Sequence, residues 1–256
     1  MQLPDLRLAL ELAEAADEIT MKHFRTASLE VRTKSDKTPV SEADEAVERM
    51  IRERLARERP DDGIVGEEYG ASGSALTAGG RRWIIDPIDA TKNYVRGVPV
   101  FATLIALEDN GTIAAGVVSA PALGRCWSAS RGSGAFCNGL AIRASNVATL
   151  EYASIGYDSV TDFDRTGNAE QFLALVRHCG RARGLGDFWI HMLVAEGAVD
   201  IAVEPTVAPW DVAAVQVIVE EAGGRFTDLA GNARHDGGSA LSTNGALHET
   251  VLEMLR

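Results

Sequence analysis

The chain has 256 residues, of which 46% are hydrophobic, and a formal net charge of −12. This length can bury a large core, as one large domain or as two closely packed halves, and the acidic balance argues against nucleic acid as a partner because phosphate backbones are bound by basic surfaces. The sequence has no run of eighteen apolar residues and no basic stretch followed by an apolar one at its start, so we expect neither a membrane span nor an export signal.

The first part of the chain shows two amphipathic helix patterns. Leu3, Leu6 and Leu10 recur at helical spacing and predict an opening helix. Ser41 is followed three residues later by Asp44, the spacing of a helix capping box, ahead of the apolar positions of a second helix. Helix capping is therefore one role open to Asp44.

Two short apolar runs end in carboxylates. Residues 64–65 precede Glu67, and residues 83–85 precede Asp86, as expected of buried strands, and Pro87 is expected to end the second one. Asp86 and Asp89 then flank a proline-fixed turn, where their carboxylates offer hard oxygen ligands for one or two Mg²⁺ ions. The simpler alternative is that Asp86 ends a strand and Asp89 caps a helix.

A further acid favours a metal site. Asp211 begins a segment in which Val212, Val215 and Val219 fall at helical spacing, which places this acid at the N-terminal edge of a helix. Strand ends and helix starts often converge on one cleft in α/β proteins. So many acids could lie together in one cleft only with divalent cations present, and ligation by oxygen alone favours Mg²⁺.

The other segments predict a mixed α/β protein. Residues 71–80 are rich in small and polar residues and are expected to form a surface loop. Strands are expected over 98–107, 112–119 and 126–130, with Asn-Gly hairpin turns at 110–111 and 138–139. After a boundary at 146–150, the pattern predicts strands near 153–157 and 199–204, helices near 168–178, from 187 and from 210, then closing strands and a last helix.

Cysteines and histidines carry no motif. Cys126, Cys137 and Cys179 lack the spacing of a metal or redox site, which fits a reducing cytoplasm. The five histidines show no paired ligand spacing and are expected to be ordinary helix or loop residues.

Three separated motifs occur in a familiar order. They are Gly-Glu-Glu at 66–68, Asp-Pro-Ile-Asp-Ala-Thr at 86–91, and Trp-Asp-Val-Ala at 210–213 leading to Glu-Ala-Gly-Gly at 221–224. With the segment 34–44 they resemble the inositol monophosphatase family of Mg²⁺-dependent, lithium-sensitive phosphatases. The resemblance implies the layered αβαβα sandwich of the inositol monophosphatase and fructose-1,6-bisphosphatase superfamily. We expect an N-terminal half over 1–145 and a C-terminal half over 146–256.

The resemblance also implies a set of metal ligands. Glu67, Asp86 and the carbonyl of Ile88 would hold a first Mg²⁺, and Asp86, Asp89 and Asp211 a second. Glu67 would also support a third, weaker ion, so two or three ions are expected. A small phosphorylated substrate and a cytoplasmic homodimer are the other expectations from the family.

The chemistry expected from the family is direct attack by water. The phosphate would accept hydrogen bonds from the amides of Ala90 and Thr91, while Thr91, Asp44 and Glu67 would act as the catalytic residues. The family has glycine in place of Ala90. A methyl group there costs little at negative φ, but at positive φ, or against the phosphate, it would lower activity and leave a weakened relative.

Substrate choice is expected to depend on two other acids. Asp187 and Glu204 together would suit a cationic amine or imidazolium, and residues 92–99 and 193–200 resemble the histidinol-phosphate phosphatase branch of the family. The alternatives are a phosphatase for inositol-1-phosphate or another small phosphate monoester, and a role for Asp187 as the N-cap of the following helix.

Overall fold

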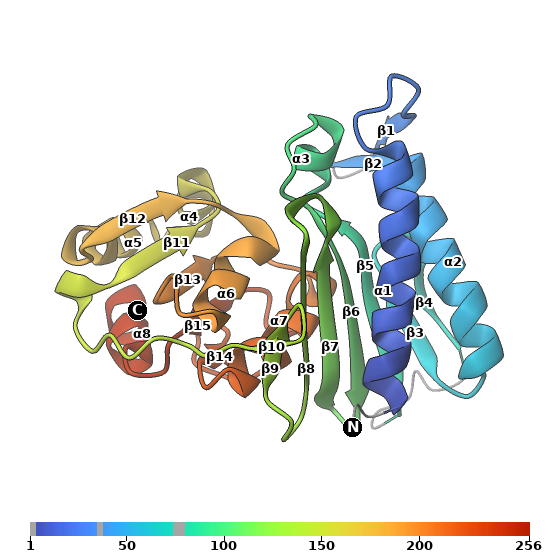
Figure 1. The fold of residues 1–256 in the computed structure, drawn as a ribbon. Helices are drawn as coiled ribbons and strands as arrows, with labels where there is room; N and C mark the ends of the chain where they lie inside the picture. The colour runs from blue at the N-terminus through green and yellow to red at the C-terminus, as the bar shows by residue number, and fades with distance from the viewer. Residues whose placement is uncertain (1–3, 35–37, 74–79) are drawn as a thin grey trace.

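The secondary-structure elements stack in five layers. The computed structural model describes residues 4–34, 38–73 and 80–256. Figure 1 shows a helix pair, an eight-stranded sheet, a middle pair of helices, a five-stranded sheet and an outer group of helices, in that order. This is the αβαβα sandwich that the family resemblance implied.

The first layer consists of helices α1 (Pro4–His23) and α2 (Glu42–Glu58). Between them the hairpin of β1 (Val31–Thr33) and β2 (Pro39–Ser41) leads into α2, and Ser41 forms the expected capping box with Asp44. Both helices bury their apolar stripes against the eight-stranded sheet, around residues such as Leu12. The predicted opening helix is therefore confirmed.

The eight-stranded sheet has the strand order β10-β9-β8-β7-β6-β5-β3-β4. Its strands are β3 (Gly63–Gly66), β4 (Gly70–Ser72), β5 (Arg82–Asp89), β6 (Ala102–Asp109), β7 (Thr112–Ala120), β8 (Arg125–Ser130), β9 (Ala135–Cys137) and β10 (Leu140–Ala141). β3 and β5 are parallel, and the other pairs are antiparallel. The two predicted Asn-Gly turns both have positive φ, as two-residue hairpin turns require.

Strand β5 is buried on both faces. Ile84 packs toward the middle helices, while Trp83 and Ile85 pack under α1 and α2. The prediction that Pro87 ends this strand is wrong. The strand continues to Asp89, and its pairing with β6 shifts register between Asp86 and Asp89. Such a bulge leaves a residue outside the hydrogen-bond ladder, so it tolerates a proline, which has no N–H to donate.

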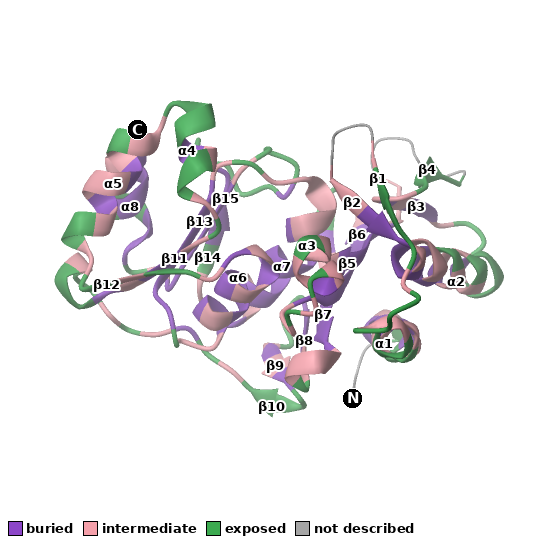
Figure 2. Cartoon of the chain, turned by 90° about the horizontal axis from the view of Figure 1, so that it is seen from above, coloured by how far each residue is buried: buried purple, intermediate pink, exposed green. Residues whose placement is uncertain are grey.

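Helices α6 (Asp187–Ala195) and α7 (Pro209–Glu221) form the middle layer. α7 packs on β7 and β6 on one side and on α6 on the other, so eight consecutive residues from Val212 to Val219 are buried. Figure 2 shows this helix as a nearly continuous buried segment between the two sheets. Its position brings the start of α7 close to the end of the interior strand β5.

The five-stranded sheet has the order β12-β11-β13-β15-β14. Its strands are β11 (Ser154–Tyr157), β12 (Arg181–Gly184), β13 (Ile201–Glu204), β14 (Arg225–Thr227) and β15 (Ala240–Thr243). The outer helices are α4 (Val160–Thr166), α5 (Ala169–His178) and α8 (His248–Leu255), and short 3₁₀ turns lie at Pro121–Leu123 and Leu150–Tyr152. We keep the division at 145/146 as a proposal.

Some expectations fall at the limits of the described residues. The expected loop over 71–80 is wrong at its start, where Gly70–Ser72 pairs with β3 as strand β4, and residues 74–79 lie outside the described part. Residues 35–37 of the motif at 34–44 also lie outside it. Within the described residues, no helix is both long enough and apolar enough to cross a membrane.

Candidate active site

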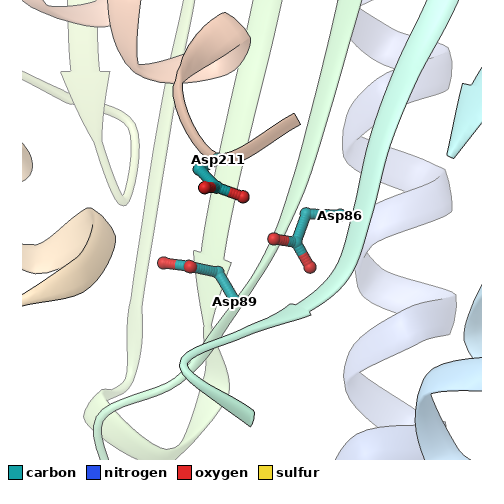
Figure 3. Close-up of side chains that lie close together, drawn as sticks. All are labelled: Asp86, Asp89 and Asp211. Atoms are coloured by element: carbon teal, nitrogen blue, oxygen red, sulfur yellow. The ribbon is translucent and has the colours of Figure 1, made fainter. Parts of the chain in front are cut away.

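Three carboxylates meet where β5, its bulge and α7 converge. Asp86 and Asp89 come from β5, and Asp211 comes from the first turn of α7. One carboxylate oxygen of each lies within 4.8 Å of the other two, and Figure 3 shows the three side chains facing one common space. Three of the residues predicted as metal ligands are therefore brought together by two elements that are far apart in sequence.

Burial makes this cluster electrostatically costly. It raises the pKa of Asp86 well above the usual carboxyl value, with the charges of Glu67, Asp89 and Asp211 adding to the effect. Burial likewise raises the pKa of Asp211 to about 7. Oδ1 of Asp86 is buried without a hydrogen-bond partner among the described residues. Hard oxygen donors around one space, one of them unsatisfied, fit a divalent cation such as Mg²⁺.

Backbone hydrogen bonds orient the other two acids. The amide of Ala208 donates to Oδ2 of Asp211 at 2.8 Å, and Pro209 begins the helix. The amide of Phe188, at the start of α6, donates to Oδ2 of Asp89 at 2.8 Å. Backbone amides at the two helix starts of the middle layer therefore orient Asp89, which comes from the strand bulge, and Asp211, which comes from α7 itself.

Glu67 lies beside this cluster and outside the group of three. Its Oε1 accepts from Nζ of Lys34 at 2.7 Å, and the same ammonium pairs with Glu68 at 2.6 Å. Burial raises the pKa of Glu68 to about 7. The sequence reasoning assigned no role to this lysine, which sits 33 residues away in a region without periodic pattern.

Asp44 faces two ways. Its Oδ2 accepts from the backbone N and the hydroxyl of Ser41 at 2.8 and 2.5 Å, while its Oδ1 lies 3.5 Å from Oγ1 of Thr91. Thr91 Oγ1 also donates to the carbonyl of Ile88 at 3.0 Å. Burial raises the pKa of Asp44 to about 6. One oxygen thus caps α2 and the other points into the site.

Ala90 adopts the left-handed conformation, with φ 66° and ψ 43°. It precedes α3 (Thr91–Val95), whose first N–H groups have no partner within the helix. The sequence left the sign of φ at Ala90 open, and the structure gives the positive value, which strains the backbone of an L-residue.

We expect Ala90→Gly to stabilise the protein by about 0.5–1 kcal/mol, because left-handed backbone costs an L-residue about 1–2 kcal/mol and the freer unfolded glycine chain offsets part of that gain. Urea denaturation of both proteins measures the difference. The control is Ala141→Gly, since Ala141 lies in an edge strand with ordinary backbone, and this change should destabilise. A destabilised Ala90→Gly would mean that the methyl contacts outweigh the backbone strain.

Asp187 is the first residue of α6 and Glu204 is the last residue of β13, and the charges of both help to raise the pKa of Asp89. Asp187 has φ 51° and accepts from Nδ2 of Asn93 at 3.3 Å. Burial, then the charges of Asp158 and Glu204, raise the pKa of Asp187 to about 8. The N-cap alternative is wrong, because Gly186 occupies the cap position of α6 and no side-chain capping bond is formed.

His191 is a site residue that the sequence reasoning missed. The fully buried ring contacts Oε2 of Glu204 through Nε2 at 2.8 Å and Oγ of Ser242 through Nδ1 at 2.7 Å. His191 is a helix residue, as expected of the histidines, and its ring also holds the carboxylate of Glu204. No local pattern could have linked it to Glu204 or Ser242, which lie 13 and 51 residues away in the sequence.

Comparison with known proteins identifies the family of the chain. The model of the inositol monophosphatase family matches residues 2–256. The chain belongs to the inositol monophosphatase family. As a member, it is a phosphoric monoester hydrolase, and its family is metal-dependent, typically on Mg²⁺.

Individual members of the inositol monophosphatase family resemble it over nearly the full length. A histidinol-phosphatase of Mycobacterium tuberculosis is 52% identical, covering 100% of this chain and 99% of the relative, and one of Streptomyces coelicolor is 50% identical, covering 99% and 97%. Among solved structures, an IMPase of Thermotoga maritima superposes with a TM-score of 0.87 at 35% identity, covering 99% and 97%.

Proposed function

We propose that this chain is a Mg²⁺-dependent histidinol-phosphate phosphatase. The observation that carries the proposal is the pair of acids, Asp187 and Glu204, on the substrate side of the three-carboxylate cluster. Histidinol phosphate is anionic at one end and cationic at the other, so it matches a metal site beside a carboxylate pair. The names of the relatives that are 50–52% identical agree with this substrate.

The metal ligands in this proposal are those with oxygens that face the common space. Asp86, Asp89 and Asp211 would share one ion, and Glu67, Asp86 and the carbonyl of Ile88 another. A third ion would need Glu67 to release Lys34. When bound, Mg²⁺ neutralises the acids, polarises the phosphate and lowers the pKa of bound water.

The residues around the ions would then direct attack by water. Thr91 Oγ1 lies between Asp44 and the carbonyl of Ile88, so it can accept a proton from water while donating its own to Oδ1 of Asp44. The amides of Ala90 and Thr91 would hold the phosphate oxygens. Phosphorus is attacked directly and the alcohol leaves from the opposite side, so no phospho-enzyme forms.

The cationic end of the substrate would lie between Asp187 and Glu204. Glu204 is held by His191, so its carboxylate has a fixed position when the substrate arrives. Asp187 is mostly buried beside other acids, and a cation in this place relieves their mutual repulsion. An uncharged sugar alcohol would gain nothing comparable.

The experiment that tests the proposal compares phosphate release from histidinol phosphate and inositol-1-phosphate, in parallel, with and without Mg²⁺. We expect turnover of histidinol phosphate to exceed that of inositol-1-phosphate and to vanish in a chelator. A preference for inositol-1-phosphate would replace the proposed substrate with the runner-up. If neither substrate reacts with this protein but both react with Ala90→Gly, the chain is the weakened relative.

We expect Asp187→Asn to lower kcat/KM for histidinol phosphate about 10- to 100-fold, the loss of one desolvated charged contact worth about 1.5–3 kcal/mol. Asparagine tolerates the positive φ at this position and can keep the contact with Asn93. Turnover of inositol-1-phosphate should change less than about threefold on the same grounds. The matched control is Asp164→Asn, which removes an exposed acid of α4. Equal losses of kcat/KM for both substrates would show that Asp187 does not recognise the cationic end of histidinol phosphate.

The raised carboxyl pKa values predict an unusual pH dependence. In the metal-free folded protein, Asp211 and Asp187 keep their protons up to about pH 7 and pH 8, respectively. In the unfolded chain such acids lose their protons near pH 4. Between these limits the folded state holds the extra protons, so stability falls as the pH rises through the window. We therefore expect the melting temperature in chelator to rise when the pH is lowered from 8 to 6.

Protons and Mg²⁺ compete for the carboxylate of Asp211, so the stabilisation by Mg²⁺ should become smaller as the pH is lowered from 8 to 6. Thermal melts at pH 6, 7 and 8, with chelator and with saturating Mg²⁺, give both slopes. Parallel melting curves in the two conditions would contradict a shared set of acids.

We also propose that the protein is a homodimer of a reducing cytoplasm, as the family resemblance suggests. Cys126, Cys137 and Cys179 are free thiols. Light scattering during gel filtration would establish the subunit number.

A further inference from the structure

Helix α2 carries a row of three charged side chains spaced four residues apart. They are Asp44, Glu48 and Arg52, one on each successive turn. Asp44 reaches toward Thr91 in the site. Glu48 plays no part in the chemistry proposed above, yet it is a fully buried carboxylate one turn away, so the reason for its burial lies elsewhere.

Glu48 binds the turn that carries Glu67. Its Oε2 accepts from the amide of Glu68 at 2.7 Å, and its Oε1 accepts from the amide of Tyr69 at 3.2 Å. Nε of Arg52 donates to the same Oε1 at 2.7 Å. Both oxygens of this buried acid are therefore satisfied, as a charge without access to water requires.

Arg52 extends the attachment along the turn. Its Nη1 donates to Oγ of Ser72 at 2.6 Å, and its Nη2 donates to the carbonyl of Gly70. Glu48 and Arg52 thus contact four residues between the end of β3 and the end of β4, namely Glu68, Tyr69, Gly70 and Ser72. That segment is fixed to the helix that also presents Asp44.

Gly66 shows how closely the acid approaches the backbone. A Cβ built at this position would lie 2.1 Å from Oε1 of Glu48, much closer than two such atoms can pack. Gly66 belongs to strand β3 and has no positive φ, so an alanine could adopt its backbone. The glycine is needed there because Glu48 occupies the space of a side chain.

We propose that Glu48 is a positioning residue for the metal site. By binding the amides that follow Glu67, it fixes this predicted ligand relative to Asp44, so that helix α2 sets the place of both. Glu48 does not contact the side chain of Glu67, so the ion pair between Glu67 and Lys34 would remain in its absence but would no longer be supported by a fixed turn. This inference rests on the proposed function, in which Glu67 ligates a metal ion.

The first test measures metal affinity directly, using Mn²⁺ and electron paramagnetic resonance. Loss of a group that orients a ligand typically weakens metal binding about 10- to 100-fold, and we expect this loss for Glu48→Gln, together with a matching rise in the Mg²⁺ concentration for half-maximal rate. The KM for substrate at saturating Mg²⁺ should stay unchanged. The matched control is Glu45→Gln, an acid of the same helix that pairs with Arg32 and should keep full Mn²⁺ affinity.

A second set of variants keeps the inference testable if Glu48→Gln is poorly folded. Gly66→Ala should weaken Mn²⁺ binding about tenfold, because the methyl displaces the carboxylate. In the Glu48→Ala background, where the space is free, the same glycine substitution should have no further effect. Circular dichroism at the assay temperature establishes that each variant is folded.

The outcomes separate the inference from the proposed function. Full Mn²⁺ affinity in folded Glu48→Gln, or additive losses in the Gly66 and Glu48 pair, would overturn the positioning role. A wild-type protein that neither binds Mn²⁺ nor needs Mg²⁺ for phosphate release would overturn the proposed function itself.

Discussion

Replacement of Asp86 by asparagine should lower Mg²⁺-dependent phosphate release by about 10³-fold or more, because this acid is shared by both proposed ions and metal stabilisation of the transition state is worth several kcal/mol. The same substitution should make the metal-free protein more stable. It removes one of several mutually repelling buried charges, and a gain of about 1 kcal/mol would raise the melting temperature by about 2–4 °C in a chain of this size.

Both effects come from one property of the site. The folded protein holds mutually repelling acids close together, and bound Mg²⁺ offsets this repulsion. Asp86→Asn therefore stabilises the metal-free protein and removes its response to Mg²⁺. Melting curves with chelator and with Mg²⁺, alongside initial rates, measure the two quantities. The control is Asp109→Asn, which removes an acid at the opposite end of the strands, where it pairs with Arg81. This variant should change neither the melting temperature in chelator nor the Mg²⁺-dependent rate. Substantial Mg²⁺-dependent turnover in Asp86→Asn would rule out the shared-ligand assignment.

Local patterns predicted the elements that carry the site. The apolar run before Asp86, the capping box at Ser41 and the spacing after Asp211 each depend on residues within one or two turns of each other, and all three appear in the structure. Such signals are local, so a single sequence contains them.

Contacts between distant elements could not be read in this way. His191 meets Glu204 and Ser242 only after α6 packs on the five-stranded sheet, and Lys34 meets Glu67 across 33 residues. Neither pairing leaves a periodic trace in the chain, because its geometry is created by packing.

The course of strand β5 was mispredicted for a related reason. Proline normally ends a strand because it lacks an N–H, but here the register shift leaves no ladder bond for Pro87 to donate. Its carbonyl instead accepts from Oγ1 of Thr103 on the neighbouring strand at 2.7 Å. The same bulge sets Asp86 and Asp89 around one space, so the exception to the strand rule produces the site.

Asp44→Asn should lower kcat about 10²–10⁴-fold while keeping most of the stability, which would separate the two roles of this residue. An amide oxygen can still accept the Ser41 N–H that now binds Oδ2, so the start of α2 is preserved. The amide cannot take a proton from Thr91, so removal of the proton from water fails. Rates at saturating Mg²⁺ and substrate, with chemical denaturation, test both statements.

Ser41→Ala is the reciprocal variant. It removes the hydroxyl that caps α2, which should cost about 1 kcal/mol, but leaves Oδ1 of Asp44 facing Thr91, so the rate should change little. Thr91→Ser keeps a hydroxyl and should stay active, whereas Thr91→Val should lose as much as Asp44→Asn. Because the two residues would pass one proton, the double variant Asp44→Asn/Thr91→Val should be no slower than either single one. Fully additive losses would mean that Asp44 and Thr91 act separately, and a slow Ser41→Ala enzyme with normal stability would place the hydroxyl of Ser41 in the reaction.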